Sequence, residues 1–217
     1  AMRYNRFPDF LDFINKVALD ANFKKTSVDI KDIAYFATAL RDYPVVIDLS
    51  GIVKGPVSNL KIKSLLITDG INKVSGDLSI KGLPDINKTF FDYKNGEIYT
   101  NGAGITLYAP TLKDSSSSVA IDSLKDFNFH GNYVGTIHAF VFDGTIKSNL
   151  GDITSNVKLN MPDGIAKNAT YAGELAAENL KLGVLFKSKD LGTTTFKTTI
   201  NGKSLDLKES EVRLDAL

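Results

Sequence analysis

The sequence predicts a mainly β protein: a long curved antiparallel sheet, open and taco-like or solenoid-like, with one or two short N-terminal helices. Two observations support this fold class. From Val45 onward, apolar and polar residues alternate with a period of two, as in a half-buried strand. Asn-Gly and Asp-Gly pairs recur between these runs and favour tight hairpins, because both turn residues can adopt positive φ. No helix-length segment interrupts the pattern, which argues against βαβ folds and their nucleotide sites.

Residues 1–43 differ from the rest and are expected to form a helix-containing segment that docks on the sheet. Apolar residues at i, i+3, i+4 and i+7 form one helical stripe, and Asp9 is placed to cap its start. The stripe consists of Phe10, Phe13, Ile14 and Val17. A second helix is expected from Asp29 or Asp32 to about Leu40. Helices this short are marginal alone, so both must pack on another element.

Residues 44–217 are expected to form one repetitive antiparallel β domain. Alternation is clear in 58–63, 77–81, 156–160 and 204–208. Six glycine pairs are predicted to form turns between such runs. They are Asp69-Gly70, Asn95-Gly96, Asn101-Gly102, Asp143-Gly144, Asp163-Gly164 and Asn201-Gly202.

A weak repeat of roughly 40 residues is centred on Gly55, Gly135 and Gly173, with one copy degenerate. Each glycine has an apolar residue two positions before it, two after it and seven after it. The first two of these positions share a strand face and the third lies on the other face. A bulge, bend or turn is therefore predicted between positions +2 and +7, and recurring bulges curve a sheet.

Composition excludes several classes of function. Lys and Arg number 26 against 25 Asp and Glu, so the net charge of +1 gives no basic surface for a nucleic acid. The absence of cysteine excludes a disulfide framework, a thiolate metal site and a cysteine nucleophile. We expect no cofactor and no metal. The Ala1 that precedes Met2 indicates a piece of a longer protein.

We expect no catalytic residue and no enzymatic activity. His130 and His138 are expected on the polar face of one strand, without a third ligand beside them. Asp122, Asp126 and Asp143 flank that strand, where carboxylates are usually solvated. A hydrolase that uses Asp122, Asp126 or His130 is the least favoured alternative.

Two further motifs carry no predicted chemistry. The serine run 115–118 has no indicated base that would activate a nucleophile. The segment 102–104, Gly-Ala-Gly, is too short for a phosphate fingerprint and has no expected helix after it.

The apolar residues suggest a ligand-binding surface. The chain has 13 Phe and 8 Tyr, most of which are expected in the core. A curved sheet that does not close leaves a concave apolar face, which suits a long, thin ligand such as a lipid acyl chain. Burying a chain of ~16 carbons is worth on the order of 10 kcal/mol. The residues expected to line this trough are Val53, Val57, Leu60, Ile62, Tyr133, Ile137, Phe140, Phe142, Tyr171, Leu175, Leu180 and Leu182.

Three segments share a degenerate pattern of glycines and apolar residues. They are 49–62 with 75–85, 129–135 with Gly144 and 150–152, and 171–175 with 179–183 and 190–192. Together with the short helix expected at 30–40, they resemble the repeating units of TamB-like translocation and assembly module proteins, which belong to the AsmA-like group.

The resemblance implies a periplasmic segment of a protein anchored in the inner membrane. Such a segment would act as a hydrophobic conduit for phospholipid between inner and outer membrane, or in outer-membrane protein assembly. A BamA-related outer-membrane barrel is an implied partner, bound through parts of the parent protein outside this chain. No catalytic residue or cofactor comes with the family. The alternative is a non-catalytic structural or adhesive β-solenoid of the cell surface that holds no ligand.

Overall fold

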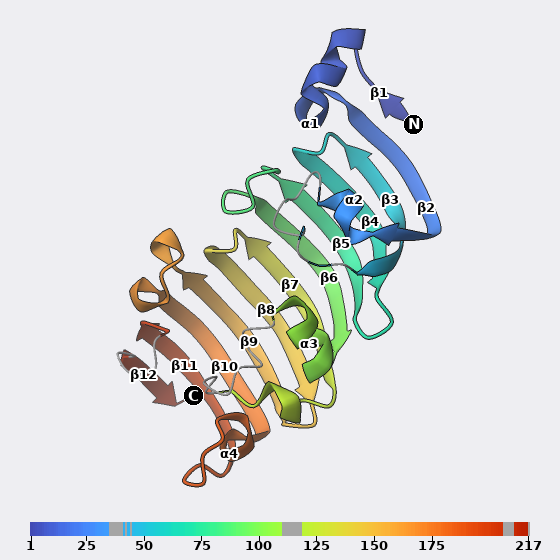
Figure 1. Ribbon diagram of the computed structural model, residues 1–217. Helices are drawn as coiled ribbons and strands as arrows, with labels where there is room; N and C mark the ends of the chain where they lie inside the picture. The colour runs from blue at the N-terminus through green and yellow to red at the C-terminus, as the bar shows by residue number, and fades with distance from the viewer. Residues whose placement is uncertain (35–40, 42, 44, 110–118, 206–210, 217) are drawn as a thin grey trace. The chain divides into compact units, whose positions relative to one another are not determined.

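The computed structural model describes residues 1–34, 41, 43, 45–109, 119–205 and 211–216. Within these residues, twelve strands form one open sheet, and each strand lies beside its neighbour in the chain (Figure 1). The printed strand pairs of the sheet, such as β2 with β3 and β9 with β10, are antiparallel. The predicted fold class, mainly β with a few short helices, is thus confirmed.

The strands are β1 (Met2–Arg3), β2 (Ala18–Asp29), β3 (Val46–Gly55), β4 (Asn59–Thr68), β5 (Lys73–Lys81), β6 (Phe90–Thr100), β7 (Phe127–Gly135), β8 (Ala139–Ser148), β9 (Asp152–Asn160), β10 (Thr170–Lys181), β11 (Thr193–Lys203) and β12 (Glu211–Ala216). The helices are η1 (Phe7–Asp12), α1 (Phe13–Lys16), α2 (Ile30–Ile33), α3 (Gly102–Tyr108), η4 (Ile121–Ser123), η5 (Pro162–Gly164), η6 (Ala166–Asn168) and α4 (Leu182–Leu185). Across the described residues, none of these helices has the length and apolar character needed to cross a membrane.

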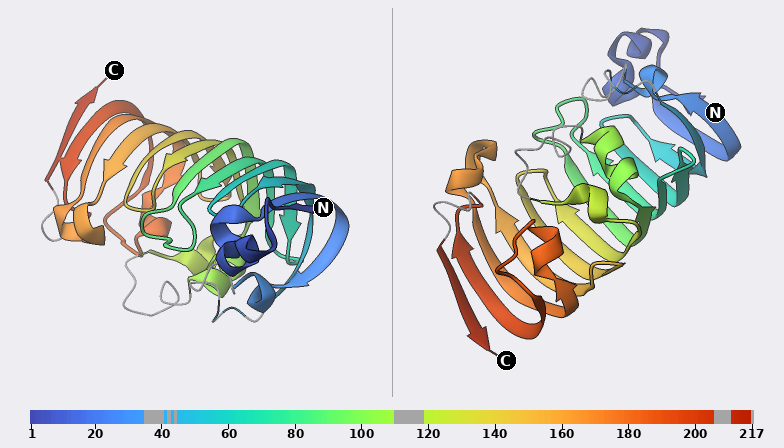
Figure 2. Two further views of the ribbon diagram at one scale, coloured as in Figure 1. Left: turned by 90° about the horizontal axis from the view of Figure 1, so that it is seen from above. Right: turned by 60° about the horizontal axis from the view of Figure 1, so that its bottom comes forward.

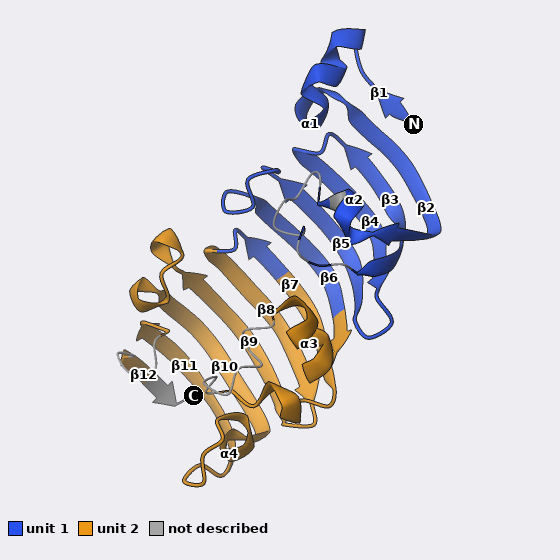
Figure 3. Ribbon diagram, in the orientation of Figure 1, with its two compact units in different colours: residues 1–97, 133–137 blue, residues 98–132, 138–217 orange. Residues whose placement is uncertain are grey.

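The chain divides into two compact units (Figure 3). Unit 1 contains residues 1–97 and 133–137, and unit 2 contains residues 98–132 and 138–217. Each unit therefore builds its own section of sheet and its own apolar surface.

The N-terminal segment contains a long strand that the change of period at Val45 does not indicate. After the short helices η1 and α1, the chain enters β2, which pairs with β3. Asp9 does not occupy the N-cap. It is the third residue of η1, and its carboxylate accepts hydrogen bonds from the backbone N–H groups of Asn5 and Arg6. Helix α2 starts directly after Asp29, one of the two predicted starting points, and Asp29 caps it by accepting from the N–H of Lys31.

The second predicted helix is described only at its start. Helix α2 ends at Ile33, and residues 35–40 lie outside the described part of the chain. The predicted end at Leu40 therefore falls beyond what the structure describes, as does the serine run at 115–118.

Two of the six glycine pairs lie in connections between strands, as predicted. Asp69-Gly70 connects β4 to β5, and Asp163-Gly164 lies between β9 and β10 with both residues at positive φ. The turn prediction is wrong for the other four. Asn101-Gly102 begins helix α3, and three pairs lie inside strands, namely Asn95-Gly96 in β6, Asp143-Gly144 in β8 and Asn201-Gly202 in β11.

The three glycines inside strands make room for aromatic rings. A Cβ at Gly96 would lie 2.2 Å from Cε1 of Tyr93, and a Cβ at Gly202 would lie 2.3 Å from Cζ of Tyr171. At Gly144 it would lie 2.5 Å from Cε2 of Phe129. Glycine within a strand commonly marks such a close approach, and a ring lying over it restores the missing packing.

Bulges interrupt the pairing of β2, β4 and β10, and the strands bend along their length (Figure 2). Each bulge contains one residue at positive φ: Lys25 in β2, Ser64 in β4 and Asn179 in β10. An inserted residue increases local twist and bends the strand, so these positions curve the sheet.

The predicted break between positions +2 and +7 is present in all three repeat copies. It is the β3–β4 turn after Gly55, the β7–β8 turn after Gly135 and the β10 bulge after Gly173. The copies are nevertheless not structurally equivalent, because Gly55 and Gly135 end strands whereas Gly173 lies within β10.

Candidate functional site

The strand register of unit 1 gathers apolar side chains on one face of the sheet. Directly paired residues in neighbouring strands point to the same side. Val53 pairs with Ile62, which pairs in turn with Leu78, and Leu60 pairs with Ile80. The apolar face of unit 1 comprises Leu19, Ala21, Phe23, Val28, Ile47, Leu49, Val53, Leu60, Ile62, Leu65, Ile67, Val74, Leu78 and Ile80.

The register of unit 2 produces a second apolar face. Phe140 pairs with Leu159, which pairs with Tyr171, while Phe142 pairs with Val157. Phe142 also stacks on Phe129 with ring centroids 4.8 Å apart. The apolar face of unit 2 comprises Phe140, Phe142, Ile146, Ile153, Val157, Leu159, Tyr171, Leu175, Ala177, Leu180, Phe196 and Ile200.

The bulge in β10 keeps Leu180 on the apolar face of unit 2. Without it, Leu175 and Leu180 would point to opposite sides, because they are five residues apart. Ala177 pairs with Phe196 and Leu180 pairs with Thr194, so one extra residue is accommodated between these two pairs. Asn179, within the bulge, takes positive φ, and its N–H donates to Oγ1 of Thr195 at 3.0 Å.

Charged residues of the paired strands lie on the opposite face. In unit 1, Lys63 and Asp77 form an ion pair there, with Nζ and Oδ2 2.7 Å apart. In unit 2, Lys158, Glu174 and Lys197 alternate with apolar-face residues. Neither apolar face, as defined above, contains an ionisable group other than the Tyr171 hydroxyl.

Both apolar faces remain partly accessible to solvent. Twelve of the fourteen side chains of the unit 1 face and ten of the twelve of the unit 2 face are only partly buried. The buried exceptions are Ile47 and Leu65 in unit 1, and Ala177 and Leu180 in unit 2. A second sheet or a long helix normally covers a face of this kind. The described part of the chain contains one sheet, and its longest helix is the seven-residue α3.

The structure places eight of the twelve predicted trough residues on the two apolar faces. Val53, Leu60 and Ile62 belong to the apolar face of unit 1. Phe140, Phe142, Tyr171, Leu175 and Leu180 belong to that of unit 2. Leu182 lies outside both faces, as the first residue of α4 directly after β10.

The other three predicted residues have different positions. Val57 and Ile137 lie in the β3–β4 and β7–β8 turns, and Val57 is buried whereas Ile137 is exposed. Tyr133 lies in β7, and its hydroxyl donates to the carbonyl of Thr136 at 2.7 Å. Sequence reasoning also left out Leu78 and Leu159, although the alternation in 77–81 and 156–160 contains both.

One end of the strands in unit 2 is closed by a packed group of connections. The side chain of Asn149 joins β8–β9 to the segment before β7: its Nδ2 donates to the carbonyl of Ser123, and its Oδ1 accepts from the N–H of Lys125, both at 2.9 Å. The N–H of Ala120 donates to the carbonyl of Leu185, the last residue of α4. These bonds join the connections at this end of the strands to one another.

The residues considered for chemistry are not assembled into a site. His130 lies in β7, but His138 lies in the following turn, so the two do not share a strand as predicted. The described residues contain no group of three or more His, Asp or Glu that could hold a metal ion. The segment 102–104 does begin a helix, contrary to prediction, because Asn101 caps α3 by accepting from the N–H of Gly104.

Among the described residues, three side chains have shifted pKa values, and each shift reflects burial or a hydrogen bond within the sheet. Burial raises the pKa of Tyr93 to about 12, and its hydroxyl donates to the carbonyl of Ser75 at 2.5 Å. Burial also raises the pKa of Tyr133. The pKa of Asp77 is lowered by its hydrogen bond from Lys63 and by one from the backbone N–H of Ser64.

No protein family, no curated protein and no solved structure matches this chain. Membership in the TamB-like group therefore stays a prediction from the sequence.

Proposed function

We propose that this chain binds lipid acyl chains along the apolar faces of its sheet and serves as a segment of a hydrophobic conduit for phospholipid. The observation that carries this proposal is the pair of uncharged apolar faces whose side chains remain partly accessible. Each partly buried side chain can still gain about 25 cal/mol for every Å² that a ligand covers. An acyl chain suits such a face, because it contributes methylene groups and requires no hydrogen-bond partner.

The cellular setting of this activity is proposed from the resemblance to TamB-like proteins. We place the chain in the periplasm, within a parent protein anchored in the inner membrane and acting in outer-membrane biogenesis. A BamA-related barrel is the proposed partner of that parent. The parent reading frame tests this setting: an N-terminal anchor and further copies of the unit support it, and a cytoplasmic enzyme around the chain contradicts it.

Adjacent residues on opposite faces of β10 provide a direct test of lipid binding. Leu175 belongs to the apolar face of unit 2, whereas its neighbour Ala176 points to the other face. If an acyl chain covers about 50 Å² of Leu175, Leu175→Asn weakens binding by about 1.3 kcal/mol, or roughly tenfold. Ala176→Asn leaves the affinity unchanged. The measurement is titration with a fluorescent fatty acid, with circular dichroism to confirm that both variants fold.

Two results would contradict the proposal. One is equal affinity in the two variants, which would separate fatty-acid binding from the apolar face. The other is the absence of fatty-acid binding together with no phospholipid in an organic extract of the purified protein. That second result would favour a structural or adhesive role without a ligand.

A further inference from the structure

Large apolar side chains are concentrated on the surface of the N-terminal segment. Leu11 is 93% exposed, Phe7 80%, Met2 56% and Tyr4 48%. With Phe10, these residues form what we term the N-terminal aromatic cluster. The rings pack on one another: the centroids of Tyr4 and Phe10 are 4.6 Å apart in an edge-on arrangement, and those of Phe7 and Phe10 are 6.1 Å apart. The cluster is thus an ordered surface of the segment.

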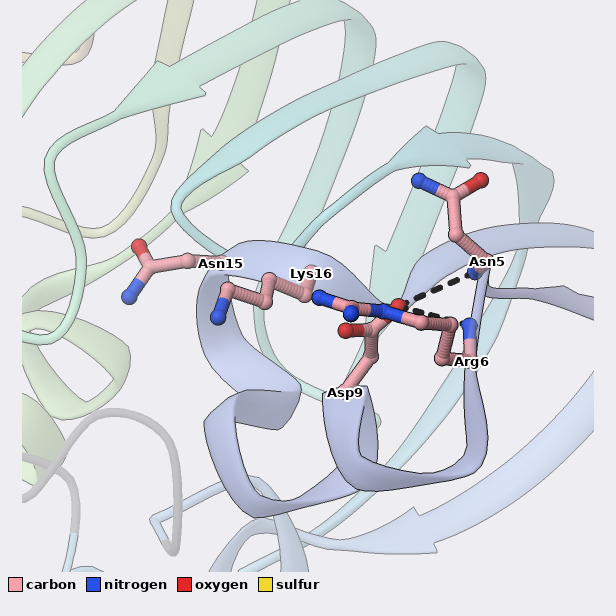
Figure 4. A pocket seen from close by; sticks show the side chains of 5 residues that line it. All are labelled: Asn5, Arg6, Asp9, Asn15 and Lys16. Atoms are coloured by element: carbon pink, nitrogen blue, oxygen red, sulfur yellow. Dashed lines mark hydrogen bonds between the residues drawn. The ribbon is translucent and has the colours of Figure 1, made fainter.

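A polar pocket lies in the same N-terminal segment, between residues 5 and 16 (Figure 4). It is lined by Asn5, Arg6, Asp9, Asn15 and Lys16. Oδ2 of the buried Asp9 accepts from the backbone N–H groups of Asn5 and Arg6, so the carboxylate is engaged with the backbone. The remaining lining groups are two cations and two amides. Nδ2 of Asn15 already donates to Oδ1 of Asp12 at 2.7 Å, so the donors that suit a phosphate are those of Arg6, Lys16 and Asn5.

The cations of the pocket are available to an external anion. The ion pairs of this segment join Arg3 to Asp20 and Lys16 to Asp12, and Arg6 takes part in neither. The Lys16 pair is 3.7 Å long and solvent-exposed, so it is weak. Arg6 precedes Phe7 directly. The long Arg6 side chain can therefore reach the headgroups of a lipid surface that takes up the Phe7 ring.

We propose that this N-terminal segment docks on a phospholipid surface. The aromatic cluster enters the boundary between headgroups and acyl chains, and the pocket around Arg6 takes a lipid phosphate. Phe, Tyr and Leu with neighbouring basic residues are typical of segments that lie in a membrane interface. The proposal goes beyond acyl-chain binding by the sheet and does not depend on it.

The exposed area also favours a lipid surface over a second copy of the chain. Large side chains offer 150–250 Å² each, and the exposed fractions leave roughly 600 Å² in the cluster. A stable protein dimer buries about 800 Å² on each partner. A bilayer requires no complementary shape and supplies phosphates at the level of Arg6.

Vesicle flotation with the full chain tests the docking. The vesicles contain phosphatidylethanolamine with 30% phosphatidylglycerol in one arm and phosphatidylcholine alone in another. Because its targets are exposed, the double variant Phe7→Gln, Leu11→Gln should fold normally and bind the vesicles at least about tenfold more weakly. Ile71→Gln, which removes another exposed apolar residue of unit 1, should bind as the wild type does.

Charge variants separate phosphate recognition from general attraction. Arg6→Gln should weaken binding several-fold to both kinds of vesicle. Lys73→Gln removes an exposed charge on β5 and should weaken vesicle binding less than Arg6→Gln does. Inorganic phosphate at millimolar concentration should not displace the protein from vesicles. Binding of inorganic phosphate by the wild type together with no vesicle binding would instead identify a site for the free ion and overturn the membrane assignment.

Two further outcomes would overturn the proposal. One is vesicle binding that persists in the Phe7→Gln, Leu11→Gln variant. The other is a wild-type dimer in solution that this variant converts to a monomer, with no vesicle binding by either protein. Fatty-acid titration of the Leu175→Asn and Ala176→Asn pair is a separate measurement, so failure of the docking is distinguishable from failure of acyl-chain binding.

Discussion

Replacing Gly96 by alanine adds one methyl group at a point where the structure leaves no room for it. The new Cβ would lie 2.2 Å from Cε1 and 2.5 Å from Cζ of the Tyr93 ring. The ring must therefore move, and its hydroxyl must leave the carbonyl of Ser75. Overpacking costs about 1–3 kcal/mol, and loss of the buried hydrogen bond costs a similar amount. Alanine also loses less backbone entropy on folding than glycine, which offsets about 0.5–1 kcal/mol, so the free energy of unfolding falls by about 2–4 kcal/mol.

Urea unfolding followed by far-UV circular dichroism measures this effect, and a double-mutant cycle assigns it to the ring. In the Tyr93→Leu background, Gly96→Ala should be neutral or slightly stabilising, which gives a coupling energy of at least about 2 kcal/mol. Gly192→Ala is the control, because no atom lies within 4 Å of its added Cβ. Equal destabilisation by Gly96→Ala in both backgrounds would refute the close approach of the ring.

Two more predictions concern other contacts. Asn149→Ala removes both hydrogen bonds of a half-buried amide and should cost about 1–3 kcal/mol in urea unfolding, whereas Asn156→Ala on an exposed site should change stability little. The lowered pKa of Asp77 means that its contribution to stability is present at neutral pH and is lost as pH falls below about 4. Asp77→Ala should therefore destabilise the protein by up to about 1 kcal/mol at pH 7 and much less at pH 3. Asp77→Asn should lose less stability at pH 7 than Asp77→Ala, because the amide oxygen can still accept from the N–H of Ser64 although the ion pair with Lys63 is lost. A difference in unfolding free energy between wild type and Asp77→Ala that does not change with pH would contradict this reasoning.

The Asn-Gly and Asp-Gly pairs illustrate how local sequence can mislead. A pair of this kind forms a connection at Asp69-Gly70, whereas another lies within a strand at Asn201-Gly202. Local chemistry permits positive φ in both places. What separates them is the Tyr171 ring over Gly202, which is supplied by a neighbouring strand.

The sequence pattern failed to predict strand β2 for a similar reason. Its residues 23–26 include Lys24 and Lys25 at a bulge, so the apolar alternation changes phase partway along the strand. A periodicity of two cannot be recognised across such an insertion. Pairing with β3 defines this strand, and that partner begins at Val46, 17 residues after β2 ends.

The sequence by itself determined the mainly β class, the open antiparallel arrangement, the need for a break after Gly55, Gly135 and Gly173, and the apolar character of the face containing Leu175. The β class, the breaks and the apolar face follow from alternation and parity, which are properties of a single strand, whereas the antiparallel arrangement was inferred from the glycine pairs expected in hairpins. Only the tertiary structure decided which breaks are turns and which are bulges, and that Leu175 and Leu180 point to the same side. The reason is physical: the side-chain direction beyond a bulge depends on the register with the neighbouring strand, and register is a property of two strands.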